Sequence, residues 1–242
     1  MKVFVVPDTH VPYHDKKAWE LALQAMRGFR PDRVVFIGDF GDMYSVSDHS
    51  KDPARKDLLH EEVDAVNREL DRVQDLVDGN AIFIEGNHED RLRRYLWDKA
   101  PKLLGTTDIP KLYRTKERGW IHVRYRDALP INNVAYTHDL GRSGVYAARQ
   151  SLVDFGGNLV IGHTHRGGVV YQGEAKGSSH FCLNVGWLGD VKAIDYMHRA
   201  KALRDWQLGF GTVIHDGPKR AFARFHPVVG GKVEVDGKIN TV

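Results

Sequence analysis

Residues 34–39 read VVFIGD, four apolar residues that run directly into a glycine and an aspartate. Short apolar runs rich in β-branched residues are typical of strands covered on both faces. The same arrangement recurs outward along the chain, each run being followed at once by polar residues. The predicted strands are residues 3–6, 34–37, 81–84, 134–136 and 159–161. Because helical stretches separate them, these runs predict an α/β layered domain.

Each of the five predicted strands leads into side chains of the metal-ligand type. If the strands lie side by side in one sheet, their exits collect at one edge, where open α/β sheets bind ligands. One Asp or His at a strand end is an ordinary turn former or helix cap, but five such exits in succession indicate a site. The residues placed in this way are Asp8, His10, Asp39, Asn87, His138, His163 and His165.

The chemistry of this set is coherent, because it offers only oxygen and imidazole-nitrogen donors. Such donors suit Mn, Fe, Zn or Ni, and the single cysteine, Cys182, excludes both a cysteine-rich zinc site and an internal disulfide. Seven protein ligands are too many for one ion and suit two if one carboxylate bridges them. Two divalent ions against two carboxylates leave a positive excess of about two charges, which attracts phosphate. We therefore expect two divalent metal ions, with manganese as the first choice.

Outside this set the chain reads as one domain. Periodic apolar residues predict helices over residues 16–28, 58–77, 89–99 and 144–155, the second with Asp57 as its N-cap and Gly79 as its stop. Later apolar runs predict strands over residues 181–186, 211–215, 221–225 and 232–235. We expect a single domain over 1–242, in which 1–166 form the motif-bearing core and 167–242 add completing strands.

Composition narrows the class of protein further. The chain has 242 residues, of which 42% are hydrophobic and 28% charged, and a formal net charge of +3, so a globular protein with a sizeable core is expected. No apolar run approaches the length that spans a bilayer, and the first residues do not form a secretory signal. We expect a cytoplasmic protein with no membrane partner. The oligomeric state stays open.

The motifs together resemble the calcineurin-like metallophosphoesterase superfamily. The blocks that match, in family order, are Asp8-x-His10, Gly38-Asp39-x-x-Asp42, residues 86–89 (GNHE), His138 and residues 162–165 (GHTH). A narrower resemblance to small members carried by phages and prophages rests on residues 38–47, 86–95, 162–166 and 206–211. The resemblance implies a four-layer α/β/β/α sandwich with a dinuclear metal site at the sheet edge.

The resemblance also assigns roles within the site. It implies that Asp8, His10, Asp39 and His165 bind one metal, and that Asp39, Asn87, His138 and His163 bind the other, with Asp39 as the bridge. His88 is similar to the family's non-ligand histidine, which assists the leaving oxygen after a metal-bridging hydroxide attacks phosphorus. Asp42 matches the acid that orients this histidine, and a carboxylate partner is expected to raise the pKa of His88.

The predicted activity is that of a metal-dependent phosphoester hydrolase. Met43 and Glu85 stand where phosphoprotein phosphatases of the superfamily carry arginine, which counts against a phosphoserine phosphatase. A phosphodiester in DNA, RNA or a nucleotide is the favoured substrate. The predicted activity therefore includes that of a nuclease. The alternatives are a small-molecule phosphomonoesterase and a non-catalytic metal-binding scaffold.

Four further residues are candidates for contact with the substrate. Arg91 and Arg94 share a face of the helix predicted after His88, where they either grip a phosphate or form a solvated surface. Arg166 directly follows the last ligand pair and either contacts phosphate or forms a loop salt bridge. His14 either lines the entrance or serves a structural role, which is the more common one for a lone histidine.

Overall fold

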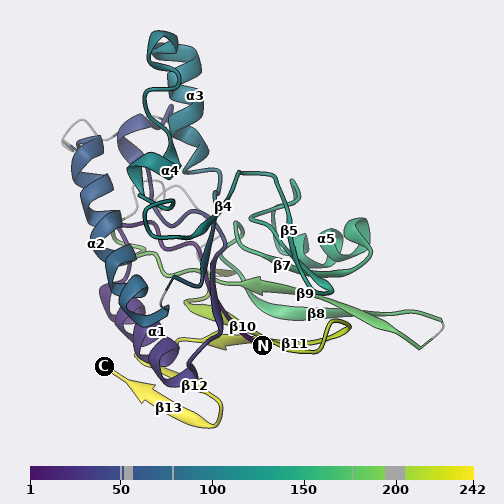
Figure 1. The fold of residues 1–242 in the computed structure, drawn as a ribbon. Coiled ribbons are helices and arrows are strands. Elements are labelled where there is room, and N and C mark those ends of the chain that lie inside the picture. The colour runs from purple at the N-terminus through teal and green to yellow at the C-terminus, as the bar shows by residue number, and fades with distance from the viewer. Residues whose placement is uncertain (50, 52–56, 78, 176, 194–204) are drawn as a thin grey trace.

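The computed structural model of the protein describes residues 1–49, 51, 57–77, 79–175, 177–193 and 205–242, and its core is two β-sheets stacked face to face (Figure 1). The first sheet has the strand order β11-β10-β1-β2-β3-β4. Strands β1 to β4 run parallel, and β10 pairs antiparallel with β1. Its strands are β1 (Lys2–Val6), β2 (Arg33–Phe36), β3 (Ala81–Ile84), β4 (Ile121–Val123), β10 (Gly209–Asp216) and β11 (Arg220–Pro227).

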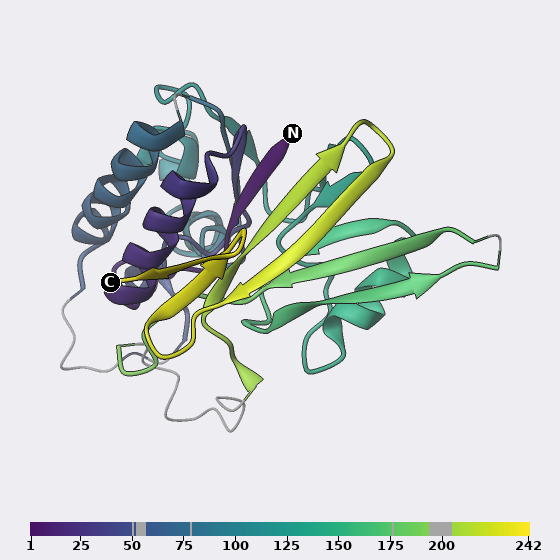
Figure 2. The same cartoon turned by 90° about the horizontal axis from the view of Figure 1, so that it is seen from below.

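The second sheet has the strand order β5-β6-β7-β9-β8. Its three central strands are parallel, and the two edge strands β5 and β8 run antiparallel to their neighbours. Its strands are β5 (Leu129–Ile131), β6 (Val134–Tyr136), β7 (Asn158–Ile161), β8 (Gly167–Gly173) and β9 (Ser179–Val185). A separate hairpin of β12 (Lys232–Val235) and β13 (Lys238–Thr241) lies against α1, as Figure 2 shows from below.

All five strands predicted from the opening motif are present, and they divide between two sheets, as the α/β/β/α sandwich requires, rather than lying side by side in one. Strands β1, β2 and β3 belong to the first sheet, whereas β6 and β7 belong to the second. Strands buried on both faces read alike whether helices cover both sides or a second sheet covers one of them. The sequence pattern therefore could not separate these two arrangements.

Helices cover the outer faces of both sheets, which gives the predicted four layers (Figure 1). The space between the sheets is filled by aliphatic side chains from both, among them Val5, Val35, Val160 and Leu183. On the outer face of the first sheet, Phe36 and Phe83 pack with α1 and α2. On the outer face of the second sheet, α5 packs against β7 and β9. The α/β fold class expected from the sequence is confirmed.

The four predicted helices form with small shifts at their ends. They are α1 (Lys16–Phe29), α2 (Leu59–Val77), α3 (Asp90–Lys99) and α5 (Ala147–Phe155), and the structure adds α4 (Ile109–Leu112) and the 3-10 turns η1 (Tyr44–Val46) and η2 (Pro101–Leu103). Asp15 caps α1 by accepting 3.0 Å hydrogen bonds from the N–H groups of Lys17 and Ala18. Strands β4, β5, β8 and β13 were not predicted, because they are short or lie largely at exposed edges. Within the described residues, no helix has the length and apolar character needed to cross a membrane.

Candidate metal centre

The ends of β1, β2 and β3 in one sheet meet the ends of β6 and β7 in the other, and this junction gathers the predicted ligands. Three groups of side chains there place their potential ligand atoms within 4.8 Å of one another. These groups are Asp8 with His10 and His165, His10 with Asp39 and His88, and Asp39 with His138 and His163. The site is therefore built at a shared edge of two sheets rather than at the edge of one.

The first ligand group contains Asp8, His10 and His165, all buried. The Nε2 atoms of His10 and His165 lie 3.1 Å apart, and Nε2 of His165 lies 3.2 Å from Oδ2 of Asp8. Two ring nitrogens and one carboxylate oxygen thus converge on one point. Such convergence of basic donors suits a cation better than a pair of hydrogen bonds, because only one proton can fit between two facing nitrogens.

The second ligand group contains Asp39, Asn87, His138 and His163. Oδ1 of Asn87 lies 3.0 Å from Nε2 of His138 and 2.8 Å from Nδ1 of His163. Oδ2 of Asp39 lies 3.4 Å from the same Nε2 of His138. One carboxylate oxygen, one amide oxygen and two imidazoles form a mixed oxygen and nitrogen set, which is typical of first-row divalent metals.

Asp39 belongs to both sides of the junction. Its carboxylate contacts the group that contains His10 and the group that contains His138. Although burial opposes ionisation, His138 and His88 hold the pKa of Asp39 well below its ordinary value. An ionised carboxylate in this position has the charge and the placement required of a bridge between two ions.

The glycines that precede the ligands keep room for them. A Cβ on Gly86 would lie 2.1 Å from Oδ1 of Asp39, which no side chain can tolerate. Gly38 has a φ of +106°, and a Cβ there would lie 2.5 Å from Nδ1 of His138. The Gly-Asp and Gly-Asn pairs in the sequence therefore mark close backbone approach around Asp39.

Four of the seven expected ligands have a left-handed backbone. The φ angles are +57° at His10, +50° at Asp39, +69° at His163 and +58° at His165. Residues with a Cβ rarely adopt this region, and each instance costs on the order of 1 kcal/mol or more. Such strain persists where the surrounding structure fixes it, and here it coincides with the ligand set.

Hydrogen bonds from the far side of two rings set their orientation. Nδ1–H of His138 donates to the carbonyl of Ile37 at 2.9 Å, and Nδ1–H of His10 donates to Oδ2 of Asp42 at 3.1 Å. In each ring this leaves Nε2 facing the junction. Metal-ligating histidines are usually oriented in this way by their other nitrogen.

His88 and Asp42 lie together, but the contact differs from the expected one. Nδ1–H of His88 donates to the backbone carbonyl of Asp42 at 2.9 Å, whereas the Asp42 carboxylate is 3.4 Å from the same nitrogen and closer to His10. The carboxylates of Asp39 and Asp42 act to raise the pKa of His88, as expected, but the net shift is downward. Burial lowers this pKa, and Arg91 lowers it further, which outweighs the opposite effects of Asp39 and Asp42.

Of the predicted substrate contacts, Arg91 lies deepest in the site. It is buried, its Nη1 donates to the Asp42 carbonyl at 2.8 Å, and its Nη2 lies 2.9 Å from Nε2 of His88. Arg94 is exposed, with Nη2 3.3 Å from the carbonyl of Asn87 and Nε 3.3 Å from Asp90. Helix α3 therefore presents one guanidinium beside His88 and a second beside Asn87.

The other two predicted substrate contacts, Arg166 and His14, interact with other parts of the protein. Arg166 donates to the carbonyl of Thr164 at 3.2 Å and lies 3.6 Å from Asp205. His14 is buried at the start of α1 and is bridged to Gly189. Among the described residues, His14 is in none of the three groups that could hold an ion.

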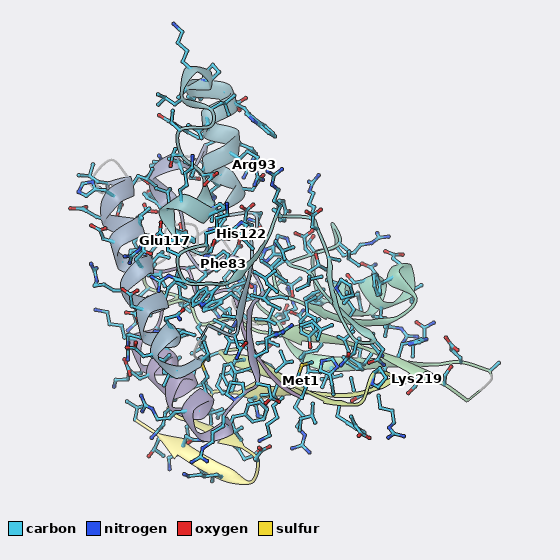
Figure 3. All side chains as sticks on the ribbon, viewed as in Figure 1. Met1, Phe83, Arg93, Glu117, His122 and Lys219 are labelled. Carbon is cyan, nitrogen blue, oxygen red and sulfur yellow. The ribbon has the colours of Figure 1, made fainter. Side chains whose placement is uncertain are left out.

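Glu85 explains one departure from the phosphatase pattern. This buried carboxylate lies 2.6 Å from Nη2 of Arg93 and 2.9 Å from Nε2 of His122, and both partners lie at the foot of α3 in Figure 3. It also accepts from the N–H of Tyr125 at 3.3 Å. The position that carries arginine in phosphoprotein phosphatases is thus used here to join β3, α3 and the loop after β4.

Two features of the site were not predicted from the sequence. Glu89 is fully buried and accepts hydrogen bonds of 2.8–2.9 Å from the N–H groups of Asp39, Gly41 and Gly86, so it joins the loops after β2 and β3. The sequence marked Glu89 only as the last residue of the GNHE block, without indicating its hydrogen bonds. Trp187 and Trp206 enclose the ring of His165. Trp206 opens the 206–211 block of the resemblance, but nothing in the sequence places either tryptophan beside His165.

The two-sheet sandwich and the donors that converge at its junction have the arrangement that the resemblance to calcineurin-like metallophosphoesterases implies. The particular relatives are phage proteins: the chain is 28% identical to the gene 54 protein of Mycobacterium phage D29 and 26% identical to that of Mycobacterium phage L5, each over 98% of both chains. This similarity confirms the resemblance to phage-borne proteins.

Family models and solved structures add less. No family model matches the chain. Among solved structures, the chain aligns with YfcE, a phosphoesterase from E. coli, at 14% identity and a TM-score of 0.44, over 89% of this chain and 90% of YfcE. It also aligns with vacuolar protein sorting 29 from Cryptosporidium parvum at 15% identity and a TM-score of 0.45, over 99% of this chain and 94% of that one.

Proposed function

We propose that this protein is a metal-dependent phosphoester hydrolase that cleaves phosphodiesters in nucleic acid or nucleotides. The observation that carries the proposal is the shared carboxylate of Asp39, which lies between two groups of buried or half-buried donors. One carboxylate with ligands on both sides is what a pair of divalent ions requires. When bound, the ions supply a nucleophile from water and stabilise the charge that develops on phosphorus.

The contacts described above divide the residues that would hold the ions into two sets, one for each ion. Asp8, His10 and His165 would hold one ion and Asn87, His138 and His163 the other, with Asp39 shared. The donor set fits such ions, because five of its seven members are buried and Asn87 and His163 are half-buried, it includes no lysine or arginine, and it mixes oxygen with imidazole nitrogen. Manganese is the first choice, with Fe, Zn or Ni as alternatives.

We assign the leaving-group step to His88. Its Nε2 faces the junction, 3.7 Å from Oδ2 of Asp39, while its Nδ1–H is held by the Asp42 carbonyl. In the neutral ring Nδ1 carries the proton and Nε2 accepts from Arg91, so a leaving oxygen bound beside Asp39 would take a hydrogen bond or proton from Nε2 when the ring is protonated on both nitrogens. Asp42 is a positioning residue in this scheme, because it holds the rings of both His88 and His10.

Arg91 is the proposed phosphate contact. Its Nη2 lies next to Nε2 of His88, so a phosphoryl group that approaches His88 also approaches this guanidinium. Two N–H donors from one guanidinium match two oxygens of a phosphate. Arg91 would thus stabilise negative charge at the point where His88 acts.

The preference for a nucleic-acid or nucleotide diester rests on the exposed cations around the junction. Arg94 lies beside Asn87, and Arg124 and Arg126 are exposed on the loop that follows β4. Arg126 is stacked on the ring of Tyr125, which in turn lies 6.0 Å from the ring of His138. An extended anion with several phosphates would meet these side chains, whereas a small phosphomonoester would not.

The test compares substrates under the same metal load. The metal-free protein, reloaded with Mn²⁺, is assayed on bis(p-nitrophenyl) phosphate, on p-nitrophenyl phosphate and on single- and double-stranded DNA and RNA. We expect turnover of the bis-aryl ester and of at least one nucleic acid. Cleavage of the monoester alone would overturn the diester assignment, and two bound ions with no turnover of any substrate would favour the scaffold.

A further inference from the structure

The three buried ligand histidines of the metal centre are held in two different ways. His10 and His138 each donate a hydrogen bond from Nδ1, to Asp42 and to the carbonyl of Ile37. His165 is as deeply buried, but its Nδ1 has no hydrogen-bond partner among the residues that the structure describes. Within the part of the chain that the structure describes, the usual second partner of a metal-ligating imidazole is therefore absent at this position.

Two indole rings pack against the imidazole of His165. The ring of Trp187 stacks on His165 with centroids 4.9 Å apart and an angle of 14° between the planes. The ring of Trp206 meets His165 in a T-shape at 4.2 Å, and the two indoles lie 4.9 Å from each other. We call these two residues the indole box. It fixes the plane of the imidazole by packing, without supplying an oxygen to Nδ1.

The backbone holds the indole box against the ligand loops. Trp187 is 1% exposed and bridges to Asp8, and the N–H of the next residue, Leu188, donates to the Asp8 carbonyl at 2.8 Å. The N–H of Trp187 itself donates to the carbonyl of Gln207 at 3.1 Å. Trp187 is thus a positioning residue whose place is set by the strand end that carries Asp8.

This arrangement affects which nitrogen of His165 carries the proton. Without an ion, Nε2–H can donate to Oδ2 of Asp8, 3.2 Å away, so that tautomer is satisfied. An ion that binds at Nε2 moves the proton to Nδ1, where the indole box offers no acceptor. A buried N–H donor without a partner raises the free energy of the bound state. This effect weakens ion binding only at the site that contains His165.

We propose that the ion held by Asp8, His10 and His165 binds about ten- to a hundredfold more weakly than the ion held by Asn87, His138 and His163. The size of the difference is the usual effect of removing a hydrogen-bond partner from a ligating histidine. The inference rests on the two-metal centre of the proposed function, and it makes the site beside the indole box the exchangeable one.

The experiment measures binding and not turnover. Metal-free protein is titrated with Mn²⁺ by calorimetry and, in parallel, by tryptophan fluorescence. Two steps are expected, with dissociation constants that differ by about ten- to a hundredfold. Because Mn²⁺ quenches nearby indoles, the loss of fluorescence should accompany the weaker step. Equal steps, or quenching that accompanies the tighter step, would overturn the proposal.

Two variants of Trp206 separate the missing acceptor from a general effect on packing. Trp206→Gln brings an amide oxygen and water to the imidazole, and should tighten the weaker step about tenfold while leaving the tighter step unchanged. Trp206→Phe keeps an apolar wall and should leave both steps as in the wild type. An unchanged weaker step in folded Trp206→Gln would refute the inference. If both steps appear as expected but no phosphoester is cleaved, the proposed function fails and this inference stands.

Discussion

The backbone N–H of His88 donates a 2.8 Å hydrogen bond to Oδ1 of Asp39. The residue assigned to the leaving group and the carboxylate assigned to both ions are therefore fixed to each other, although they come from different strand exits. The bond leaves Oδ2 of Asp39 facing His138 and His88. Any change at Asp39 should thus affect ion binding and the geometry of His88 together.

Asp39→Asn tests the bridge. The amide oxygen can still accept from His88, so the fold should persist, but the negative charge shared by the two groups is lost. We expect the metal content to fall from two ions per chain to one or fewer, and kcat/KM for bis(p-nitrophenyl) phosphate to fall by about a thousandfold or more. Elemental analysis and steady-state kinetics measure both. Asp216→Asn, at an exposed carboxylate paired with Arg220, should change neither value.

Gly86→Ala tests the close approach of the backbone to Asp39. The new methyl group would lie 2.1 Å from Oδ1, so the carboxylate must move away from its shared position. We expect loss of metal and of activity. The matched control is Gly28→Ala in α1, where a Cβ meets nothing within 4 Å, and which should stabilise the protein by about 0.5–1 kcal/mol. A Gly86→Ala variant that binds two ions normally would contradict the described geometry.

Arg91→Ala tests the proposed phosphate contact. The variant should keep both ions, since no ligand is altered, and should lower kcat for the diester by about ten- to a hundredfold. Arg91 also donates to the Asp42 carbonyl, so thermal unfolding must be measured beside the kinetics. Arg220→Ala removes an exposed cation from β11 and serves as the control. Equal kcat values in the two variants would remove Arg91 from the mechanism.

Glu62 gives a pH dependence of stability that does not involve the ions. Burial, together with the charges of Asp42 and Asp57, raises the pKa of Glu62 to about 7, although Ser45 donates to it. Because this folded pKa exceeds the ordinary value of 4.5, the folded state favours the protonated form. The destabilisation is small below the unfolded pKa and grows as the pH rises to 7.

Glu62→Gln, which imitates the protonated acid, should therefore stabilise the protein more at pH 8 than at pH 5, by about 2 kcal/mol. Chemical unfolding at the two pH values measures the difference. Glu61→Gln changes the exposed neighbour on α2 and should show no such dependence. A constant offset between wild type and Glu62→Gln at both pH values would show that Glu62 does not titrate in this range.

The strands, and the side chains that gather at the junction, could be predicted because their signals are local. An apolar run that ends in Gly-Asp or Gly-His can be recognised within about six residues of sequence. The structure confirms two such runs as the strands β2 and β7. The number of sheets could be predicted from the family resemblance but not from the strand pattern, since the strands before Asp39 and before His163 are equally apolar on both faces. Which sheet each strand joins depends on contacts between residues far apart in the sequence, such as Val5 with Leu183.

The interior of the site was predictable only in part. The GNHE block marked His88 and Asn87, but not that Glu89 would accept three backbone N–H groups, because a lone glutamate on a helix start reads as an ordinary cap. Trp187 carries no signal at all, since its role depends on the end of β9 lying beside Asp8. Asp42 was identified, but its carboxylate lies closer to His10 than to His88.

The placement of the ligands on two sheets has a mechanical consequence. Residues 8–87 hold one side of the cage and residues 138–165 the other, and no disulfide can join them, because Cys182 is the single cysteine of the chain. A pair of bound cations would crosslink these two halves of the sandwich. Removal of the ions by a chelator should then weaken the contact between the two sheets as well as abolish hydrolysis. The stability of the folded protein would therefore depend on the concentration of free metal.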